Sequence, residues 1–537
     1  MGDAELGHKR LKVDEYPNFK LSRSGENKIH VLDLSNGTIS NSISTESVVP
    51  SKEWIHENYV APRVPLLIRG SNNSNYFKGD LNAFKLENIG KTLDVNGGDD
   101  DKQEFELLQV EELINGGFGS GRRRLKITMK DFLERIKMGE CLYMTTQYED
   151  NDPLKLSESD DDDDDDDDDE IKETGNKNSS VNTFADIAKD AALIMQNAFN
   201  KQNRANIPDE ELETDNESLN FNTDDFHDDF DDLQDDFAAE DIGNESDTDV
   251  DPIYQPPLNN LLRNNNLGAL PPTPMNAFSN LIPQQINLWI GKTPRPTEQS
   301  QLGTLEIERN QTGEIVNMNR GLPTNNVTST GLHHDHADNL YVLIQGSKRF
   351  TLFSPDLARK LYTVGDIRQI YDTGVIDYVK NDNAPNWKGV AADGGCMAAD
   401  EIDFNDAMKR DEQKDPPSFT VIPPALLHLK DVQNEKLRDE LEEFCKIKYP
   451  LFNEIKSCAM EVELNDGDML FLPAGWFHEV SSFGSKEENI DNGVHIALNY
   501  WFIPPDKRDK EYMDYPYTNE GWEEYYQEWK KNYFDDN

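Results

Sequence analysis

Cysteine is scarce in this chain. The 537 residues include four cysteines, Cys141, Cys396, Cys445 and Cys458, and no two of them form a CxxC pair. Zinc ribbons and related fingers need such pairs, and a disulfide framework needs a regular set of cysteines. The sequence therefore excludes a cysteine-based metal module and predicts reduced thiols.

Basic charge and long apolar runs are lacking as well. Lys and Arg number 53 against 104 Asp and Glu, and the formal net charge is −51. Neutralising phosphates needs clustered Lys and Arg, so we expect no direct binding to duplex DNA or to an anionic membrane. No run approaches the roughly 18 apolar residues of a membrane helix, and the N-terminus lacks the apolar core of a secretory signal. We expect a cytoplasmic or nuclear protein.

Acidic residues, by contrast, are abundant and concentrated. Positions 160–169 are an unbroken run of aspartate, and "DDFHDDFDDLQDD" forms a second cluster. Such runs repel themselves and cannot bury enough apolar area to fold. Between them, "VNTFADIAKDAALIMQNAFNKQ" has apolar residues at helical spacing. We read it as one helix in a disordered acidic insertion, either a docking helix or, as we favour, a marginal solvated one.

The rest of the chain has short strand-like runs separated by Gly, Pro and Asp-Gly turns. This pattern is typical of an all-β barrel or jelly roll, and Ser51 and Thr128 are placed to cap two flanking helices. "PLLIRG" and "CLYMTT" read as strands, and "GTLEIERN" with "GEIVNMNR" as a hairpin. The expected parts are a flexible segment at 1–45, a helix and strand region at 46–148, the insertion at 149–255, a β core at 256–510 with polar insertions near 292–329 and 370–440, and a helical tail at 511–537.

Three of the ten histidines lie together in "TGLHHDHADN", which begins at Thr330. If this stretch begins a strand, His333 and Asp335 point to one face, and His334 and His336 to the other. A third ligand is available in His478, after the turn in "GDMLFLPAGWFHEV". Two histidines and one carboxylate form the facial triad of non-haem Fe(II) oxygenases. Tetrahedral zinc with the same ligands stays open.

At these residues the chain resembles a known family. "TGLHHDHADNLYVLIQGSKRFTLFSP", "GDMLFLPAGWFHEV" and "IALNYWF" are similar to the three signature blocks of the JmjC (cupin-8 type) 2-oxoglutarate oxygenases. "SKEWIHENYVAPRVPLLIRG", "CLYMTTQ" and "INLWIGKT" match in order. The best likeness is to the small JmjC-only (3S)-lysyl hydroxylases, which have also been assigned a peptidase activity. The resemblance covers about 45–145 and 280–510, and the three insertions have no counterpart in it.

The resemblance implies a mainly β, double-stranded β-helix (cupin) barrel and a role for each matching residue. His333, Asp335 and His478 match the iron ligands, and Lys348 matches the lysine that pairs with the C5 carboxylate of 2-oxoglutarate. A cation on a barrel strand is what such a dianion needs. Thr330 and Tyr143 match positions that hydrogen-bond the same carboxylate. Asn339 and Asn499 match polar positions beside the iron and the co-substrate. Trp289 and Tyr341 are expected to line the pocket.

One position departs from the family pattern. The family usually has Tyr, Phe or Lys between the first His and the Asp, where this chain has His334. This leaves open whether His334 could serve as the ligand, but the spacing to Asn339 and Lys348 favours His333. We expect His334 and His336 to be outward polar residues or donors behind the ligands, and His495 to pack on the final strand.

The function that the resemblance implies is an Fe(II)-, 2-oxoglutarate- and O2-dependent dioxygenase that hydroxylates a protein side chain, namely lysine. A basic substrate protein also suits an acidic enzyme, because negative potential raises the association rate. The alternatives are N-methyl-lysine demethylation, RNA-nucleoside hydroxylation and metal-dependent peptidase activity. In a different class, the chain is an acidic binding protein for basic partners. A homodimer stays open.

Overall fold

The structure is a computed structural model, and it describes residues 28–34, 50–70, 77–95, 107–112, 125–145, 147, 253–263, 270–271, 273–293, 303–324, 327–384, 387, 389–395, 416–483, 493–512 and 514–518. The acidic insertion up to residue 252, with its expected helix, lies outside these ranges, as do most of the N-terminal segment and of the C-terminal tail. Within the described ranges, no helix is long and apolar enough to cross a membrane.

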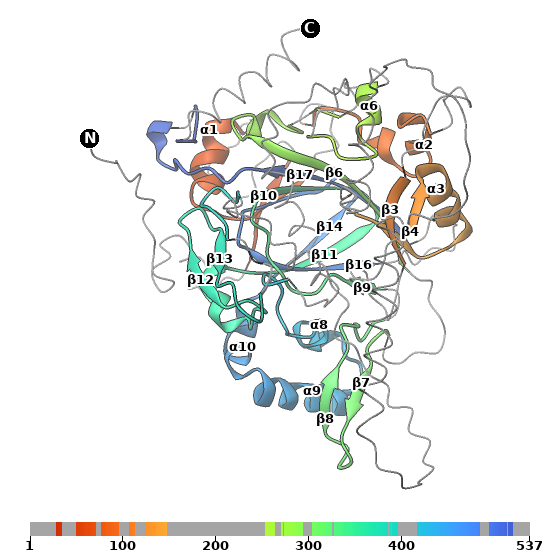
Figure 1. The fold of residues 1–537 in the computed structure, drawn as a ribbon, viewed down its shortest axis with the longest axis vertical. Helices are drawn as coiled ribbons and strands as arrows, with labels where there is room; N and C mark the ends of the chain where they lie inside the picture. Colours follow the sequence, from red (N-terminus) through yellow and green to blue (C-terminus); the bar gives the residue numbers. More distant parts are fainter. Residues whose placement is uncertain are drawn as a thin grey trace, which may run out of the picture. The chain divides into compact units, whose positions relative to one another are not determined.

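Two β-sheets form the centre of the fold (Figure 1). The larger sheet has nine strands, in the order β1 (His30–Asp33), β2 (Leu66–Arg69), β15 (Met469–Leu472), β10 (Asp338–Gln345), β17 (Val494–Phe502), β6 (Pro283–Lys292), β5 (Leu142–Met144), β3 (Leu107–Glu112) and β4 (Leu125–Thr128). The smaller sheet has the order β14 (Met460–Asn465), β11 (Ser347–Phe353), β16 (Phe477–Phe483) and β9 (Val327–Ser329). The predicted mainly β cupin fold is confirmed.

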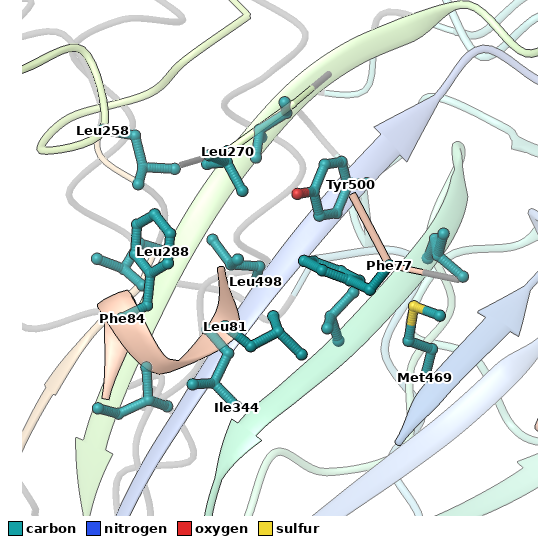
Figure 2. Close-up of a cluster of buried hydrophobic side chains, with 14 of the residues drawn as sticks. Phe77, Leu81, Phe84, Leu258, Leu270, Leu288, Ile344, Met469, Leu498 and Tyr500 are labelled. Carbon is teal, nitrogen blue, oxygen red and sulfur yellow. The ribbon is translucent and has the colours of Figure 1, made fainter. Parts of the chain in front are cut away.

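Strand β10 shows how side-chain alternation builds two cores. Leu340, Val342 and Ile344 belong to an outer apolar cluster that includes Phe77, Leu81 and Phe84, and Figure 2 shows Ile344 in this cluster with the three residues of the 77–84 segment. Tyr341 and Leu343 alternate with them and join a second cluster between the sheets, together with Phe350 and Leu352 of β11. Because the side chains on both of its faces are buried, β10 is held in place, and so is the HxD motif that precedes it.

The local signals at the flanking helices are confirmed. Helix α1 (Lys52–Ile55) begins at Ser51, whose hydroxyl accepts the N–H of Trp54 at 3.3 Å, and continues as a π-helix over His56–Val60. Helix α3 (Met129–Met138) begins at Thr128, whose hydroxyl accepts the N–H of Asp131 at 3.2 Å. The expected hairpin is also present, as β7 (Ile307–Arg309) paired with β8 (Ile315–Met318).

The stretch at 370–440, expected as a polar insertion, is folded in its described parts. It contributes β13 (Ile376–Tyr378), which pairs with β12 (Ile367–Ile370), and it leads through α8 (Pro424–Leu427) into α9 (Glu435–Lys448) and α10 (Pro450–Ile455). Helix α9 buries Leu437, Leu441 and Phe444, at the spacing of one helical face. The many charged residues of α9 lie on its other faces, and because they outnumber the apolar residues the sequence did not indicate a buried helix here.

Candidate metal centre

The HxD motif lies in a turn that precedes β10, and the expectation that it begins a strand is wrong. The strand begins at Asp338, and residue Gly331 has φ +78°. The motif is instead held by an antiparallel bridge between His333 and His478, with N–H to O distances of 3.1 and 2.7 Å, and by a hydrogen bond of 2.9 Å from the N–H of Gly475 to the carbonyl of Asp335. Within the described part of the chain, His333, Asp335 and His478 form the one group with metal-ligand geometry, their ligand atoms lying within 4.8 Å of one another.

The two ligand imidazoles are oriented by backbone carbonyls. Nδ1 of His333 lies 3.1 Å from the carbonyl oxygen of Gly331, and Nδ1 of His478 lies 3.0 Å from that of Trp476. A proton on each Nδ1 leaves Nε2 as the metal-binding atom. Burial lowers the pKa of His478 to about 4, and burial, followed by the neighbouring His478, lowers the pKa of His333 well below its usual range. Both rings are therefore neutral at pH 7, which is the form that binds a metal.

His334 and His336 lie away from the ligand cluster, but they are not outward residues. Both are fully buried. His334 Nε2 hydrogen-bonds the hydroxyl of Tyr378, and the His336 ring packs against Trp387 with centroids 5.3 Å apart. The folded segment that carries Tyr378 and Trp387 covers this side of the motif, which the sequence did not reveal. The bond to Tyr378 also excludes His334 as the first ligand in this arrangement.

Lys348 lies on the same face of the smaller sheet as His478. Along β11, Lys348, Phe350 and Leu352 pair with Ser482, Val480 and His478 of β16, so that the ammonium and the metal ligands occupy opposite ends of one face. The side chain is 2% exposed, and burial lowers its pKa to about 7. Its Nζ lies 5.4 Å from the ring centre of Tyr341 and 5.8 Å from that of Tyr143. No ion pair with Lys348 is found among the described residues.

The larger sheet carries five of the six remaining predicted residues, all except Thr330. Asn499 of β17 pairs with Tyr341 of β10. Ala497, two residues before Asn499 on the same strand, pairs with Trp289 of β6. The rings of Trp289 and Tyr341 are 6.4 Å apart, and those of Trp289 and Tyr143 are 6.3 Å apart. The structure therefore brings together the residues that sequence reasoning assigned to a co-substrate pocket.

Several buried polar atoms around Lys348 and the triad have no hydrogen-bond partner among the residues that the structure describes. They are the hydroxyl of Tyr341, both amide atoms of Asn499, Oδ1 of Asn339 and Nε1 of Trp289. A buried polar atom left without a hydrogen bond costs about 1–3 kcal/mol. Together with a buried ammonium, the donors in this set fit a small dianion with carboxylate and keto oxygens, and they are the Tyr341 hydroxyl, Nδ2 of Asn499 and Nε1 of Trp289. The residues thus fit Fe(II) with 2-oxoglutarate.

Thr330 differs from the other predicted residues. Its hydroxyl donates to the carbonyl of Gly331 at 3.0 Å and accepts the N–H of Val480 at 3.1 Å. Both contacts are to backbone groups, one in the turn before His333 and one in β16. Its role toward the co-substrate stays a prediction.

A buried ion pair behind the metal ligands was not predictable from the sequence. Arg63, which is fully buried, makes a two-pronged contact with Asp338, and Asp338 also accepts the N–H of Ala474 at 2.9 Å. The indole of Trp476 donates to the carbonyl of Arg63 at 3.0 Å. The pair therefore connects the HxD turn to the turn before His478. The partners are 275 positions apart in the chain, and no local pattern links them.

Comparison with known proteins agrees with this geometry. The Cupin-like domain family matches residues 50–508. JmjC domain-containing protein 4 of Schizosaccharomyces pombe is 24% identical over 86% of this chain and 84% of its own length. JmjC domain-containing protein E of Dictyostelium discoideum (27%) and lysine-specific demethylase JMJ32 of Arabidopsis thaliana (26%) each match over 32% of this chain and 38% of their own lengths. The chain therefore belongs to the Cupin-like domain family, as a JmjC-type Fe(II)/2-oxoglutarate-dependent oxygenase.

Proposed function

We propose that this enzyme hydroxylates a side chain of a partner protein, with lysine as the target. The observation that carries the oxygenase site is a buried ammonium, Lys348, on the same sheet face as His478 of the triad. Burying a cation is costly unless a counter-charge is supplied. The C5 carboxylate of 2-oxoglutarate supplies one, and the amide of Asn499 and the hydroxyl of Tyr341, which have no hydrogen-bond partner among the described residues, would donate to its oxygens.

The chain's own residues orient the reactants and keep water out. His333, Asp335 and His478 would hold Fe(II), which supplies the activation of O2 when bound. Lys348 anchors the far end of the co-substrate, while the rings of Tyr143, Trp289 and Tyr341 close the space around it. This leaves the metal side of the pocket for the substrate.

Lysine as the target is supported by the likeness to lysyl hydroxylases and by charge. The net charge of −51 favours encounter with a basic protein. A cytoplasmic or nuclear location fits such partners. N-methyl-lysine demethylation is the second candidate, since one relative is named a lysine-specific demethylase. The same C–H oxidation, applied to an N-methyl group, would release the methyl.

The test is release of succinate from labelled 2-oxoglutarate with Fe(II), across basic peptides with and without lysine methylation. Mass spectrometry then separates the outcomes. Gain of one oxygen on lysine supports the proposal, and loss of a methyl group supports the demethylase. Backbone cleavage would indicate a peptidase, and turnover with RNA alone would indicate nucleoside hydroxylation. His478→Ala is the matched inactive control. If the wild type shows no turnover, and His478→Ala still binds basic proteins, the result would favour a binding protein.

A further inference from the structure

The segment at 416–431 lies against the turn that carries His333. The N–H of Thr420 donates to the carbonyl of Leu332 at 2.9 Å, and the N–H of Val364 donates to the carbonyl of Phe419 at 2.8 Å. These two hydrogen bonds attach the segment to the turn before His333 and to the chain at Val364. The segment belongs to the 370–440 stretch that the sequence suggested to be a polar insertion, and it lies outside the quoted JmjC signature blocks, although the Cupin-like domain match spans it.

Phe419 stacks on the imidazole of His333. The ring centroids are 4.7 Å apart and the planes differ by 9°, and Phe419 is only 4% exposed. The hydrogen bond from His333 to Gly331 fixes the rotation of the imidazole within its plane, but it leaves the tilt of that plane free. A parallel ring at van der Waals distance fixes the tilt. The two contacts together aim Nε2 of His333.

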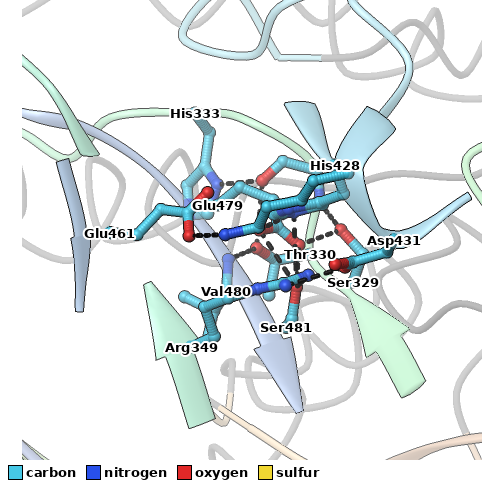
Figure 3. A network of polar contacts seen from close by, with 12 residues as sticks. Ser329, Thr330, His333, Arg349, His428, Asp431, Glu461, Glu479, Val480 and Ser481 are labelled. Carbon is cyan, nitrogen blue, oxygen red and sulfur yellow. Dashed lines mark hydrogen bonds and ion pairs between the residues drawn. The ribbon is translucent and has the colours of Figure 1, made fainter. Parts of the chain in front are cut away.

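A second connection runs from the same segment to the same turn (Figure 3). His428 Nε2 lies 2.8 Å from the carboxylate of Glu479, a residue that is fully buried and adjacent to His478. The hydroxyl of Ser329 donates to this carboxylate at 2.6 Å and accepts the N–H of Gly331 at 3.1 Å. The carbonyl of Gly331 is the group that orients His333. A chain of hydrogen bonds thus links His428 to the metal ligand.

We propose that the 416–431 segment is part of the metal centre, with Phe419 as a positioning residue for His333 and His428 as its second anchor. The inference rests on the proposed iron site. The affinity and coordination geometry of the metal therefore depend on a segment outside the family motifs. A ring at position 419 is required, and not merely an apolar side chain of the same bulk.

The experiment measures Co(II) binding by the full-length protein, by titration and by the visible absorption spectrum of the bound ion. We expect Phe419→Met, which keeps the bulk and loses the ring, to bind Co(II) about 10- to 100-fold more weakly and with a changed spectrum. Phe419→Tyr retains the ring and should restore both. Ser329→Ala, which breaks the hydrogen-bond chain without changing charge, should weaken binding by a smaller factor.

Phe452→Met is the matched control, because Phe452 is an equally buried ring on α10 that packs edge-on against Phe353, with centroids 6.0 Å apart. It should lower the melting temperature and leave affinity and spectrum at wild-type values. Wild-type affinity in both Phe419→Met and Ser329→Ala, or an equal loss in Phe452→Met, would overturn the inference. Failure of the wild type itself to bind Co(II) would instead contradict the proposed iron site.

Discussion

At the scale of single residues, the electrostatics of the pocket centre on Lys348. Burial without a counter-charge among the described residues lowers its pKa to about 7. A bound carboxylate favours the charged ammonium and raises that pKa again. We therefore expect the protein without co-substrate to hold a lysine that is only partly protonated near neutral pH, and the proposed binding of 2-oxoglutarate to be coupled to protonation of Lys348.

This coupling predicts a pH dependence of co-substrate binding. Below pH 7 the ammonium is already protonated, so affinity should be constant with respect to this group. Above pH 7 binding must take up a proton, so affinity should fall as pH rises, until the pKa of the liganded state is reached. Calorimetry in buffers of different ionisation enthalpy measures the uptake directly. Affinity that rises with pH above 7 would contradict the assignment.

Substitution of the same residue gives a second prediction. Lys348→Met should weaken 2-oxoglutarate binding by about 10- to 100-fold, because a charge-assisted hydrogen bond contributes about 1.5–3 kcal/mol. Metal binding should be retained, since Lys348 lies at the far end of the sheet face from His478. Equilibrium binding of labelled 2-oxoglutarate tests this, with Co(II) titration as the control. Equal loss of both ligands would show a general collapse of the pocket instead.

At the scale of elements, the Arg63–Asp338 pair joins three segments that are distant in the chain. Asp338 begins β10, Arg63 precedes β2, and Ala474 lies in the turn between β15 and β16. Removing one partner of a buried ion pair leaves an uncompensated charge, which costs about 3–5 kcal/mol. The pair therefore fixes the relative placement of the two turns that supply the metal ligands.

We predict that Arg63→Met lowers the free energy of unfolding by about 3–5 kcal/mol, whereas Arg63→Met combined with Asp338→Asn costs less because no charge is left unpaired. Urea unfolding measures both variants. Arg368→Met provides a comparison, since Arg368 is 46% exposed although its partner Asp377 is equally buried. A double variant no more stable than the single one would argue against the role of the charge.

Gly291 on β6 shows a constraint that acts between strands. A Cβ at this position would overlap with the rings of Tyr143 and His495 on the neighbouring strands. Gly291→Ala should therefore displace Tyr143, costing about 1–3 kcal/mol of stability and weakening 2-oxoglutarate binding. Thermal unfolding and ligand binding measure the two effects. Gly313→Ala, at φ +85° in the β7–β8 hairpin with open space around it, shows by comparison the cost of backbone strain without a clash, and it should leave 2-oxoglutarate binding unchanged.

The elements also show what a sequence can and cannot predict. The metal triad and the caps at Ser51 and Thr128 follow from spacing and local chemistry, and they are where the sequence placed them. The role of Lys348 came from the resemblance to the JmjC oxygenases and stays a prediction. The Arg63–Asp338 pair depends on three-dimensional proximity alone, and so do the burial of His334 and the constraint at Gly291. Reading a highly charged stretch as an insertion hid the apolar face of α9, because the charged residues outnumber the apolar ones there.

At the scale of the whole molecule, the two sheets and their metal-binding turns form the oxygenase, and the acidic insertion is an addition within the chain. The ligands come from segments on both sides of the 370–440 stretch, and part of this stretch packs against the turn that carries His333. The acidic run at 160–169 contributes none of the predicted site residues. Charge on this scale affects encounter with partners more than chemistry.

Deletion of about residues 155–250 should consequently leave succinate release from a saturating short peptide unchanged. Association with a full-length basic protein should become slower and less dependent on salt, because the negative field is reduced. Stopped-flow binding at two salt concentrations tests the second part. Loss of turnover with the short peptide would instead place the insertion in the catalytic machinery.

The central claim is that the triad and Lys348 form one site for Fe(II) and 2-oxoglutarate. An anaerobic titration that follows the visible charge-transfer absorption of the Fe(II)–2-oxoglutarate chelate tests it most directly. The account predicts that the band forms in the wild type, needs much more 2-oxoglutarate in Lys348→Met, and is absent in His478→Ala. No band in a folded wild-type protein, or a band unchanged in both variants, would contradict it.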